Sequence, residues 1–469
     1  MNTAMSRHLS RTNLKMASCV IRPHVRRIPF LGHRFTVVRP ARGMTSGTGT
    51  REKDRREENN NDDDGHHLMT IFEVREHLMN MVGWRREWAS GEEDKPSVRD
   101  TSSLLQHIAR SQDELPKRRP RDSFSRAVIP LGRDPSSREF YLFFNRGLRF
   151  GRLLENFDTF AGLICYKHNM KPELGPHQKS PFAFVTAMVD RIVLSPAGPA
   201  PSPYKDILMS GQVTWVGRSS MECTMHMDQE HGGELQRLIT ATYLFVARTP
   251  KTDEAAVVNP LDPQTPEERQ MFEKGELKKR SRQLASQTSL LKNPPTEDER
   301  LILHDIFLST IDLSSGSFKT RIRPENTIWM DETKLKSLTV CHPEKRNLYN
   351  KIFGGFLMRK AYELAWTNVY FFAKTCPPMC TRVDDIVFLK PVEIGDFLFL
   401  SSQVVFTRES SVQMYVHAEV VRPGDSGSRH TTNNFRFTFD MGFTDVPRVL
   451  PKTYAESMLY LDGRRHLDT

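Results

Sequence analysis

One carboxylate of the chain stands where a charged side chain is costly. Asp158 lies seven residues into the apolar segment GRLLENFDTFAGLICYKH (151–168), too far from its start to cap a helix. In a helix its face would carry Gly151, Leu154 and Ala161, so we expect the carboxylate in a tight, partly dry place. Burying a carboxylate is unfavourable without a partner or a role. It is therefore a candidate general base or, second, a nucleophile, while a polar contact at a helix interface stays open.

A pair of glycines begins the second apolar segment, GGFLMRKAYELAWTNVYFFAK (354–374). The first amides of a helix have no partner within the helix, and glycine lets a ligand approach the backbone. We therefore expect Gly354 and Gly355 to hold an oxyanion that develops during a reaction, where one donor contributes roughly 10²–10³ in rate. The alternative is that the two glycines only allow close packing of the helix.

The two halves of the chain repeat each other. VDRIVL (189–194) matches VDDIVF (383–388), and residues 206–227 match 396–420. These segments alternate and are rich in Val, Phe, Thr and Met, which predicts long antiparallel strands. In each copy the strands follow one apolar helix. The predicted fold is α+β, a tandem hot-dog, in which each copy is a curled antiparallel sheet around one long buried helix.

The segments that begin the two helices carry a family resemblance. NLYNKIFGGFLMRKAYELAW (347–366) and RFGRLLENFDTFAGLICYKH (149–168) resemble the double hot-dog acyl-coenzyme A thioesterases, in particular their mitochondrial group. The resemblance covers about 120–450. It implies hydrolysis of fatty acyl-CoA to fatty acid and coenzyme A, without a cofactor, and a role in fatty acid metabolism. It also implies a homo-oligomer, either a trimer of double hot-dogs or a dimer.

The same resemblance assigns the site residues. Asp158 matches the family's catalytic Asp, and Asn347 matches its catalytic Asn, which would orient the attacking water. One site in the family takes residues from both copies, so Asp158 would act together with Asn347, Gly354 and Gly355.

The complementary site is predicted to be degraded. Tyr362 takes the position of the catalytic Asp, and Glu363 follows it as the only candidate carboxylate. Arg359, four residues earlier, offers Glu363 an ordinary helix ion pair instead. Asn145 is the candidate relic of the catalytic Asn, and Arg152 is predicted to replace the second glycine. We therefore expect one good site per chain.

Polar residues follow the strand turns in both copies. An Arg fork suits the phosphates of coenzyme A, although polar residues at hairpin ends are also common for solubility. The candidate coenzyme A ligands are Arg218, Arg408, Ser410 and Ser411. The Cys and His spacings complete no metal site, so no metal is predicted. No Gly-x-Ser-x-Gly nucleophile elbow accompanies them.

The excess positive charge lies at the N-terminus. The whole net charge of +10 comes from residues 1–51, which hold nine Arg, one Lys and no Asp or Glu, so the other 418 residues are neutral. A neutral body argues against nucleic-acid binding. The acid-free, Arg-rich start is typical of a mitochondrial transit peptide, which predicts the matrix as the location. No apolar run reaches the ~18 residues of a membrane span.

Composition divides the chain into six predicted segments. They are a transit peptide (1–51), a polar linker with a helical extension (52–122, helical over 69–90), hot-dog domain 1 (123–250), a helical linker starting at TPEE (251–320), hot-dog domain 2 (321–443) and a C-terminal tail (444–469).

Two other functions are weighed against hydrolysis. A non-catalytic hot-dog scaffold that binds coenzyme A or a protein partner is the main alternative, because the second site is degenerate. A hot-dog dehydratase would need a His facing the site, and neither buried helix holds a His before His168.

Overall fold

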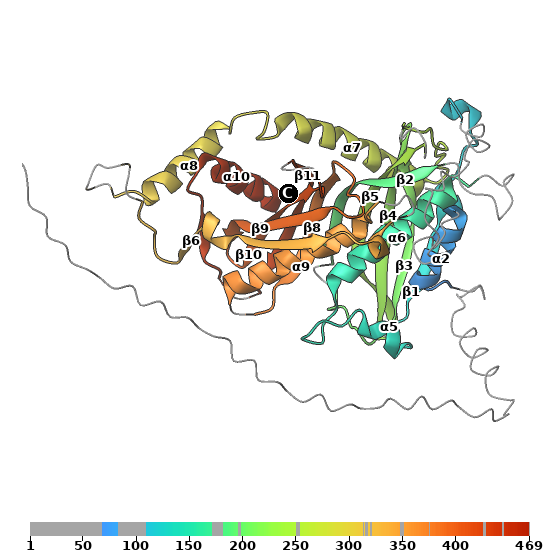
Figure 1. Ribbon diagram of the computed structural model, residues 1–469. Helices are drawn as coiled ribbons and strands as arrows, with labels where there is room; N and C mark the ends of the chain where they lie inside the picture. The colour runs from blue at the N-terminus through green and yellow to red at the C-terminus, as the bar shows by residue number, and fades with distance from the viewer. Residues whose placement is uncertain are drawn as a thin grey trace, which may run out of the picture. The chain divides into compact units, whose positions relative to one another are not determined.

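The computed structural model describes most of the chain beyond the basic N-terminus (Figure 1). The described residues are 68–82, 109–170, 182–195, 198–249, 254–312, 314, 318, 321–347, 351–374, 376–424, 428–442 and 445–468. The predicted transit peptide and the polar start of the linker lie outside them.

The described strands form a mixed α/β structure with a large antiparallel sheet. Ten strands run in the order β1-β3-β4-β5-β2-β8-β11-β10-β9-β7. The first half contributes β1 (Ser125–Ile129), β2 (Ala183–Leu194), β3 (Ile207–Val216), β4 (Ser220–His231) and β5 (Glu234–Arg248). The second contributes β7 (Leu335–Val340), β8 (Met379–Phe388), β9 (Phe397–Arg408), β10 (Ser411–Val421) and β11 (Arg429–Asp440). The order reads the same from both edges, as expected of a repeat.

The two halves meet where β2 pairs with β8. These strands carry the matching motifs VDRIVL and VDDIVF, and they run antiparallel with Val189 opposite Ile386 and Ile192 opposite Val383. The predicted hot-dog domains 123–250 and 321–443 therefore share one sheet, and the described residues belong to a single compact unit.

Two long helices lie on one face of this sheet and contact each other. They are α6 (Phe150–His168), which packs against β2 to β5, and α9 (Gly354–Ala373), which packs against β7 and β9 to β11 (Figure 1). Their apolar residues belong to one core with the inner side chains of the strands. The two predicted buried helices thus form within a residue of their predicted bounds.

The linker helix lies on the opposite face of the first half. Successive side chains of a strand point to opposite faces. On β4, Cys223 contacts Cys165 of α6, whereas Glu222 binds Lys278 of α7 (Pro266–Thr288). The predicted helix start is confirmed, because Thr265 caps α7 in a capping box.

The segment predicted as a C-terminal tail contains a helix. This helix covers the second half of the sheet in the way that α7 covers the first half. On β11, Phe437 contacts Tyr362 of α9, while Arg436 binds Asp462 of α10 (Tyr454–Asp468). Helices thus cover both faces of each half.

Shorter elements complete the described chain. The predicted extension at 69–90 contains α2 (Ile71–Val82), which packs on α6, and residues 83–90 lie outside the described part. The remaining elements are η2 (Gln112–Glu114), α4 (Pro120–Ser123), α5 (Pro135–Glu139), α8 (Glu297–Ser309), β6 (Thr327–Trp329), η3 (Met330–Thr333), η4 (Pro343–Lys345) and β12 (Arg448–Leu450).

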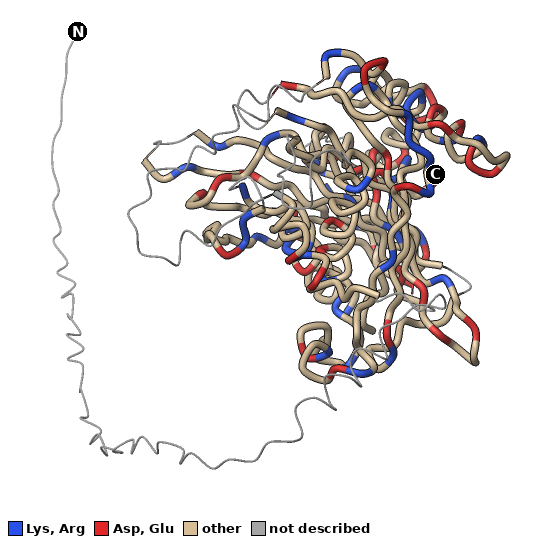
Figure 2. The backbone as a smooth tube through the Cα atoms, turned by 90° about the vertical axis from the view of Figure 1, so that its right-hand side faces the viewer, with Lys and Arg blue, Asp and Glu red and all other residues tan. Residues whose placement is uncertain are grey.

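Charge is distributed evenly in the described residues. Figure 2 shows basic and acidic residues interspersed along the backbone, in keeping with the neutral body. Within the described chain, no helix has the length and apolar character needed to cross a membrane.

Two helix glycines provide a matched test of this packing. A Cβ on Gly275 of α7 would lie 2.5 Å from Cβ of Trp215 on β3, whereas a Cβ on Gly162 of α6 would meet only Leu78, at 3.7 Å. Gly162→Ala should stabilise the protein by up to ~1 kcal/mol through helix propensity. Gly275→Ala should instead destabilise it by ~1–3 kcal/mol, because the collision outweighs that gain.

Denaturant unfolding of both variants measures the difference. Equal stability of the two variants would contradict the placement of α7 against β3.

Candidate active site

Asp158 is the buried carboxylate at the contact between the two halves. Its side chain is on α6, and the residue is 3% exposed. Oδ2 accepts a hydrogen bond from the backbone N–H of Gly355 at 2.7 Å, and Oδ1 accepts one from the hydroxyl of Thr186 at 2.6 Å. Gly355 belongs to the second half and Thr186 to the first. The carboxylate is therefore held by both copies of the repeat.

The surroundings of Asp158 favour a base that gains its proton in mild acid. Burial raises its pKa from the usual 3.8 to about 6, because the charged form loses its water. The hydrogen bonds from Thr186 and Gly355 oppose this rise, since they stabilise the carboxylate, and the nearby Glu155 charge adds to it. Near pH 7 the carboxylate is mostly ionised, yet basic enough to take a proton from water.

The two glycines at the start of α9 allow close packing, which was the predicted alternative to an oxyanion role. A Cβ on Gly355 would lie 2.8 Å from Cα of Glu155, so this glycine permits the close approach of α6. A Cβ on Gly354 would lie 3.1 Å from Oδ2 of Asp158 and equally close to the ring of Phe388, so this glycine keeps the space beside the carboxylate open.

One part of the oxyanion prediction needs correction. The amide of Gly355, predicted to hold a thioester carbonyl together with that of Gly354, already donates to Asp158. Within the described part of the chain, no acceptor is recorded for the Gly354 amide. An oxyanion role for the Gly354 amide, at this helix end, stays a prediction.

Asn347 lies in the loop that leads into α9. Its backbone N–H donates to the carbonyl of Lys351 at 2.6 Å, and its side-chain Oδ1 accepts from the Lys351 N–H at 3.1 Å. These bonds fix a tight turn that leads into α9. The catalytic role of Asn347 stays a prediction.

Thr186 is a site residue that the sequence did not reveal. It lies on β2, three residues before the VDRIVL motif, in a strand with several polar side chains. Nothing local distinguishes it, because its importance comes from facing a helix that is distant in the sequence.

The turn before α6 corrects the predicted relic of Asn347. Phe143 N–H donates to the carbonyl of Gly147, just as Asn347 N–H donates to that of Lys351. Phe143 therefore takes the position of Asn347 in the first copy. Asn145, which was the predicted relic, instead accepts a bond from the Gly147 N–H inside the turn.

The helix contacts correct the predicted loss of the second glycine. A Cβ on Gly151 would lie 3.5 Å from Cα of Arg359, and one on Gly355 would lie 2.8 Å from Cα of Glu155. These reciprocal contacts make Gly151 the counterpart of Gly355. The second glycine is therefore retained, and Arg152 does not replace it.

The complementary site is filled by aromatic rings. Phe150 takes the position of Gly354, and Tyr362 takes that of Asp158. The two rings lie 5.1 Å apart between centroids, and Tyr362 also contacts Phe437 and Phe439 at 5.7 and 5.9 Å. Burial raises the pKa of the Tyr362 phenol, so it stays neutral. This arrangement provides no base.

The strand register also identifies the counterpart of Thr186. Thr186 lies opposite Phe245 and is followed by a β-bulge, and Cys380 lies opposite Phe439 and is followed by the same irregularity. Cys380 thus replaces the hydroxyl donor with a buried thiol whose pKa is raised by desolvation.

Glu363 is bound across the helix pair. Its carboxylate lies 2.7 Å from Nη2 of Arg149 and 3.8 Å from Nη1 of Arg359. The predicted pair with Arg359 is present, but Arg149 of the other half is the closer partner. About a third of the Glu363 side chain is exposed, so these pairs contribute little to stability.

The candidate coenzyme A ligands differ in their availability. Arg408 forms an ion pair with Asp468 at 2.8 Å, and the hydroxyl of Ser410 donates to Asp440 at 2.7 Å, while Ser411 begins β10. Arg218 is exposed in the turn between β3 and β4. Binding of coenzyme A by any of these residues stays a prediction.

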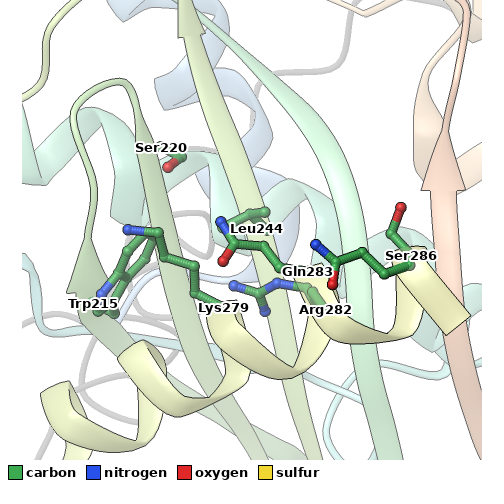
Figure 3. Close-up of a pocket in the computed structure, with 8 residues that line it drawn as sticks. Trp215, Ser220, Leu244, Lys279, Arg282, Gln283 and Ser286 are labelled. Carbon is green, nitrogen blue, oxygen red and sulfur yellow. The ribbon is translucent and has the colours of Figure 1, made fainter.

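An open pocket of about 670 Å³ lies away from Asp158, on the face covered by α7 (Figure 3). Lys279 and Arg282 extend from α7 toward the strands. Arg282 is neutralised by Asp190 and Glu222 at 3.2 and 3.3 Å, and Lys279 lies over the ring of Trp215. These contacts hold α7 on the sheet. Among the described residues, no three His, Cys, Asp or Glu side chains form a metal site.

Comparison with known proteins gives close relatives over nearly the whole chain. Mitochondrial acyl-coenzyme A thioesterase 9 of Homo sapiens is 45% identical over 431 residues, which cover 92% of this chain and 93% of that protein. The chain belongs to the acyl-coenzyme A thioesterase family. Mitochondrial acyl-coenzyme A thioesterase 4 of Humulus lupulus is a more distant member, 34% identical over 75% of this chain and 67% of its own. No family model matches the chain.

Similarity to solved structures is weaker. An acyl-CoA hydrolase from Staphylococcus aureus is 22% identical and covers 30% of this chain and 88% of its own, with a TM-score of 0.29. The family membership therefore depends on the sequence relatives.

Asp158 of this family member should lower the stability of the fold when it is ionised. Its pKa in the folded protein, about 6, lies above the usual 3.8, so folding favours the protonated form. The stability of the native protein should fall by roughly 3 kcal/mol as the pH rises from about 4 to above 6. Asp158→Asn lacks this charge and should be the more stable protein at pH 8.

Thermal melts of both proteins at pH 4.5 and pH 8 measure the difference. An Asn variant that melts well below the native protein at pH 8 would contradict this placement of the carboxylate.

Proposed function

We propose that the protein hydrolyses acyl-coenzyme A thioesters, giving a free fatty acid and coenzyme A. The observation that carries the proposal is the buried Asp158 carboxylate, held between Thr186 and the first turn of α9. Family membership supplies the substrate class, and the carboxylate supplies a base. The complementary site alone would suit a non-catalytic scaffold, but it does not account for a costly buried carboxylate.

The proposed first step is attack by water. Each carboxylate oxygen of Asp158 accepts one hydrogen bond from the protein and keeps further acceptor capacity for a water molecule. Asp158 takes a proton from this water as the water oxygen forms a bond to the thioester carbonyl carbon. Asn347, at the entrance to α9, orients the water.

The second step breaks the thioester. The carbonyl oxygen becomes an oxyanion, which the Gly354 amide and the positive end of the α9 dipole stabilise. Collapse of the tetrahedral intermediate breaks the C–S bond. The proton held by Asp158 passes to the coenzyme A sulfur, so the base is restored and the fatty acid remains.

The proposal places one site in each chain, within a tandem hot-dog fold. Two features support it: the palindromic strand order, and the pair of long helices on one face of the sheet. Phe143, Phe150 and Tyr362 remove the polar groups from the complementary position, so Glu363 has no catalytic part. Arg218 is proposed to contact the phosphates of coenzyme A.

The setting is proposed from the sequence and its relatives. The relatives carry mitochondrial names and the N-terminus is acid-free and Arg-rich, so we place the protein in the mitochondrial matrix. We also propose a homo-oligomer, either a dimer or a trimer of double hot-dogs.

Removing the base should separate the two candidate carboxylates. Asp158→Asn keeps the size of the side chain and should lower kcat by ~10²–10⁴, the usual contribution of a general base. Glu363→Gln should lower it less than about threefold, because Glu363 is in a partly exposed ion pair. Release of the coenzyme A thiol from acyl-CoA measures both variants, and a thermal melt checks folding. Equal losses would indicate two working sites.

The pH dependence should report the same group. A base must be deprotonated to act, so kcat/KM should fall about tenfold per pH unit below the Asp158 pKa of about 6 and level off above it. The residual activity of Asp158→Asn should lack this acid limb. A limb that is unchanged in the Asn variant would assign the base to another residue.

A further inference from the structure

A buried ion pair links the two helices beside the site. Nε of Arg359 on α9 lies 2.9 Å from Oε1 of Glu155 on α6, and the two side chains are only 10% and 12% exposed. Nη1 of Arg152 binds the other oxygen of Glu155 at 2.7 Å. The Arg359 contact is an ion pair without directed hydrogen-bond geometry. Glu155 is thus paired with one Arg from each half.

The pair is positioned around the hydrogen bond that holds the base. Glu155 lies three residues before Asp158, one turn earlier on α6. Arg359 lies four residues after Gly355, one turn later on α9. The backbone of Glu155 is also the surface against which Gly355 packs. The ion pair and the Gly355–Asp158 bond therefore connect adjacent turns of the same two helices.

We propose that Glu155 and Arg359 are positioning residues for the hydrolytic reaction, fixing the register of α6 against α9 and so holding Asp158 against Gly355. A slip of either helix by part of a turn would break the 2.7 Å bond and move the carboxylate from the Gly354 amide. This inference rests on the proposed role of Asp158 as the base.

The repeat shows that the pair is a specific feature of this interface. Glu155 and Arg359 occupy equivalent positions of the two helices, as the reciprocal contacts of Gly151 and Gly355 show. If both equivalent positions held the same charged residue, the two side chains would face each other across the interface with like charge. The opposite charges found here specify how the halves meet. Replacing a buried ion pair by well-packed apolar residues is often neutral for stability, so stability alone does not account for this pair.

The pair also acts on Asp158 through its charge. Glu155 raises the pKa of Asp158, and Arg359 offsets that effect by pairing with Glu155. The other groups that face or interact with Asp158 carry no net charge near neutral pH. They are the Thr186 hydroxyl of β2, the Tyr243 phenol of β5, the Cys165 thiol of α6 and the Gly355 amide of α9. Removing Glu155 and removing Arg359 should therefore shift the acid limb of kcat/KM in opposite directions.

Two single variants test the proposal. Arg359→Met leaves Glu155 less balanced, so the acid limb of kcat/KM should move up by about 0.5 pH unit, and Glu155→Gln should move it down by a similar amount. Both should lower kcat by roughly 10- to 100-fold, as expected for a misplaced base, with smaller changes in KM. The assay uses the full chain and acyl-CoA across pH 5–8.

The matched control is an ion pair of the same type away from the site. Glu299 of α8 binds Arg465 of α10 through two contacts, at 2.6 and 2.8 Å. Glu299→Gln should reduce the melting temperature while leaving kcat and the acid limb unchanged. If Arg359→Met does not fold, Arg359→Gln takes its place, since it also removes the positive charge, and the same upward shift of the acid limb is expected.

The results separate this inference from the proposed function. Lower kcat and opposite limb shifts would support it, as would a Glu155→Gln/Arg359→Met double variant less impaired than the product of the two single effects. If Asp158→Asn is inactive but the single variants keep native kcat and limbs, the positioning role is wrong. If Asp158→Asn keeps full activity, the role of Asp158 as the base is wrong, and if the native protein releases no thiol from acyl-CoA, the proposed function itself is wrong.

Discussion

The hydrogen bond from the Gly355 amide to Asp158 is the interaction on which the site depends. It requires the start of one helix to touch the middle of another, and glycine at 355 makes that approach possible because any side chain would collide with the backbone of Glu155. The approach also removes water from the carboxylate and raises its pKa. Close packing and the raised pKa of the carboxylate therefore have one structural cause.

The two halves keep the same framework and differ in what fills it. Strand order, bulges and turns correspond, yet the position of Gly354 holds Phe150 and that of Asp158 holds Tyr362. Rings at these positions fill the space with largely apolar volume, so the second interface remains well packed. A repeat whose core requires both halves can lose one site without losing the fold.

Much of the fold was predictable because its causes are local. Two apolar segments of about five turns predict buried helices, Thr265 with Glu268 predicts the start of a polar one, and alternating Val- and Phe-rich segments predict strands. The cost of burying a carboxylate likewise identified Asp158 as an unusual residue. The repeat indicated that both halves would adopt related structures.

The sequence by itself thus determined the elements, their repetition and the buried carboxylate that we propose as the base. Only the tertiary structure decided what holds that carboxylate: Thr186, from a neighbouring strand, and Gly355, 197 residues away. It also aligned the two copies. Phe143 is the residue equivalent to Asn347, whereas counting from the glycines had suggested Asn145. The physical reason is that local patterns fix periodicity and caps, whereas register between helices depends on contacts between residues far apart in the chain.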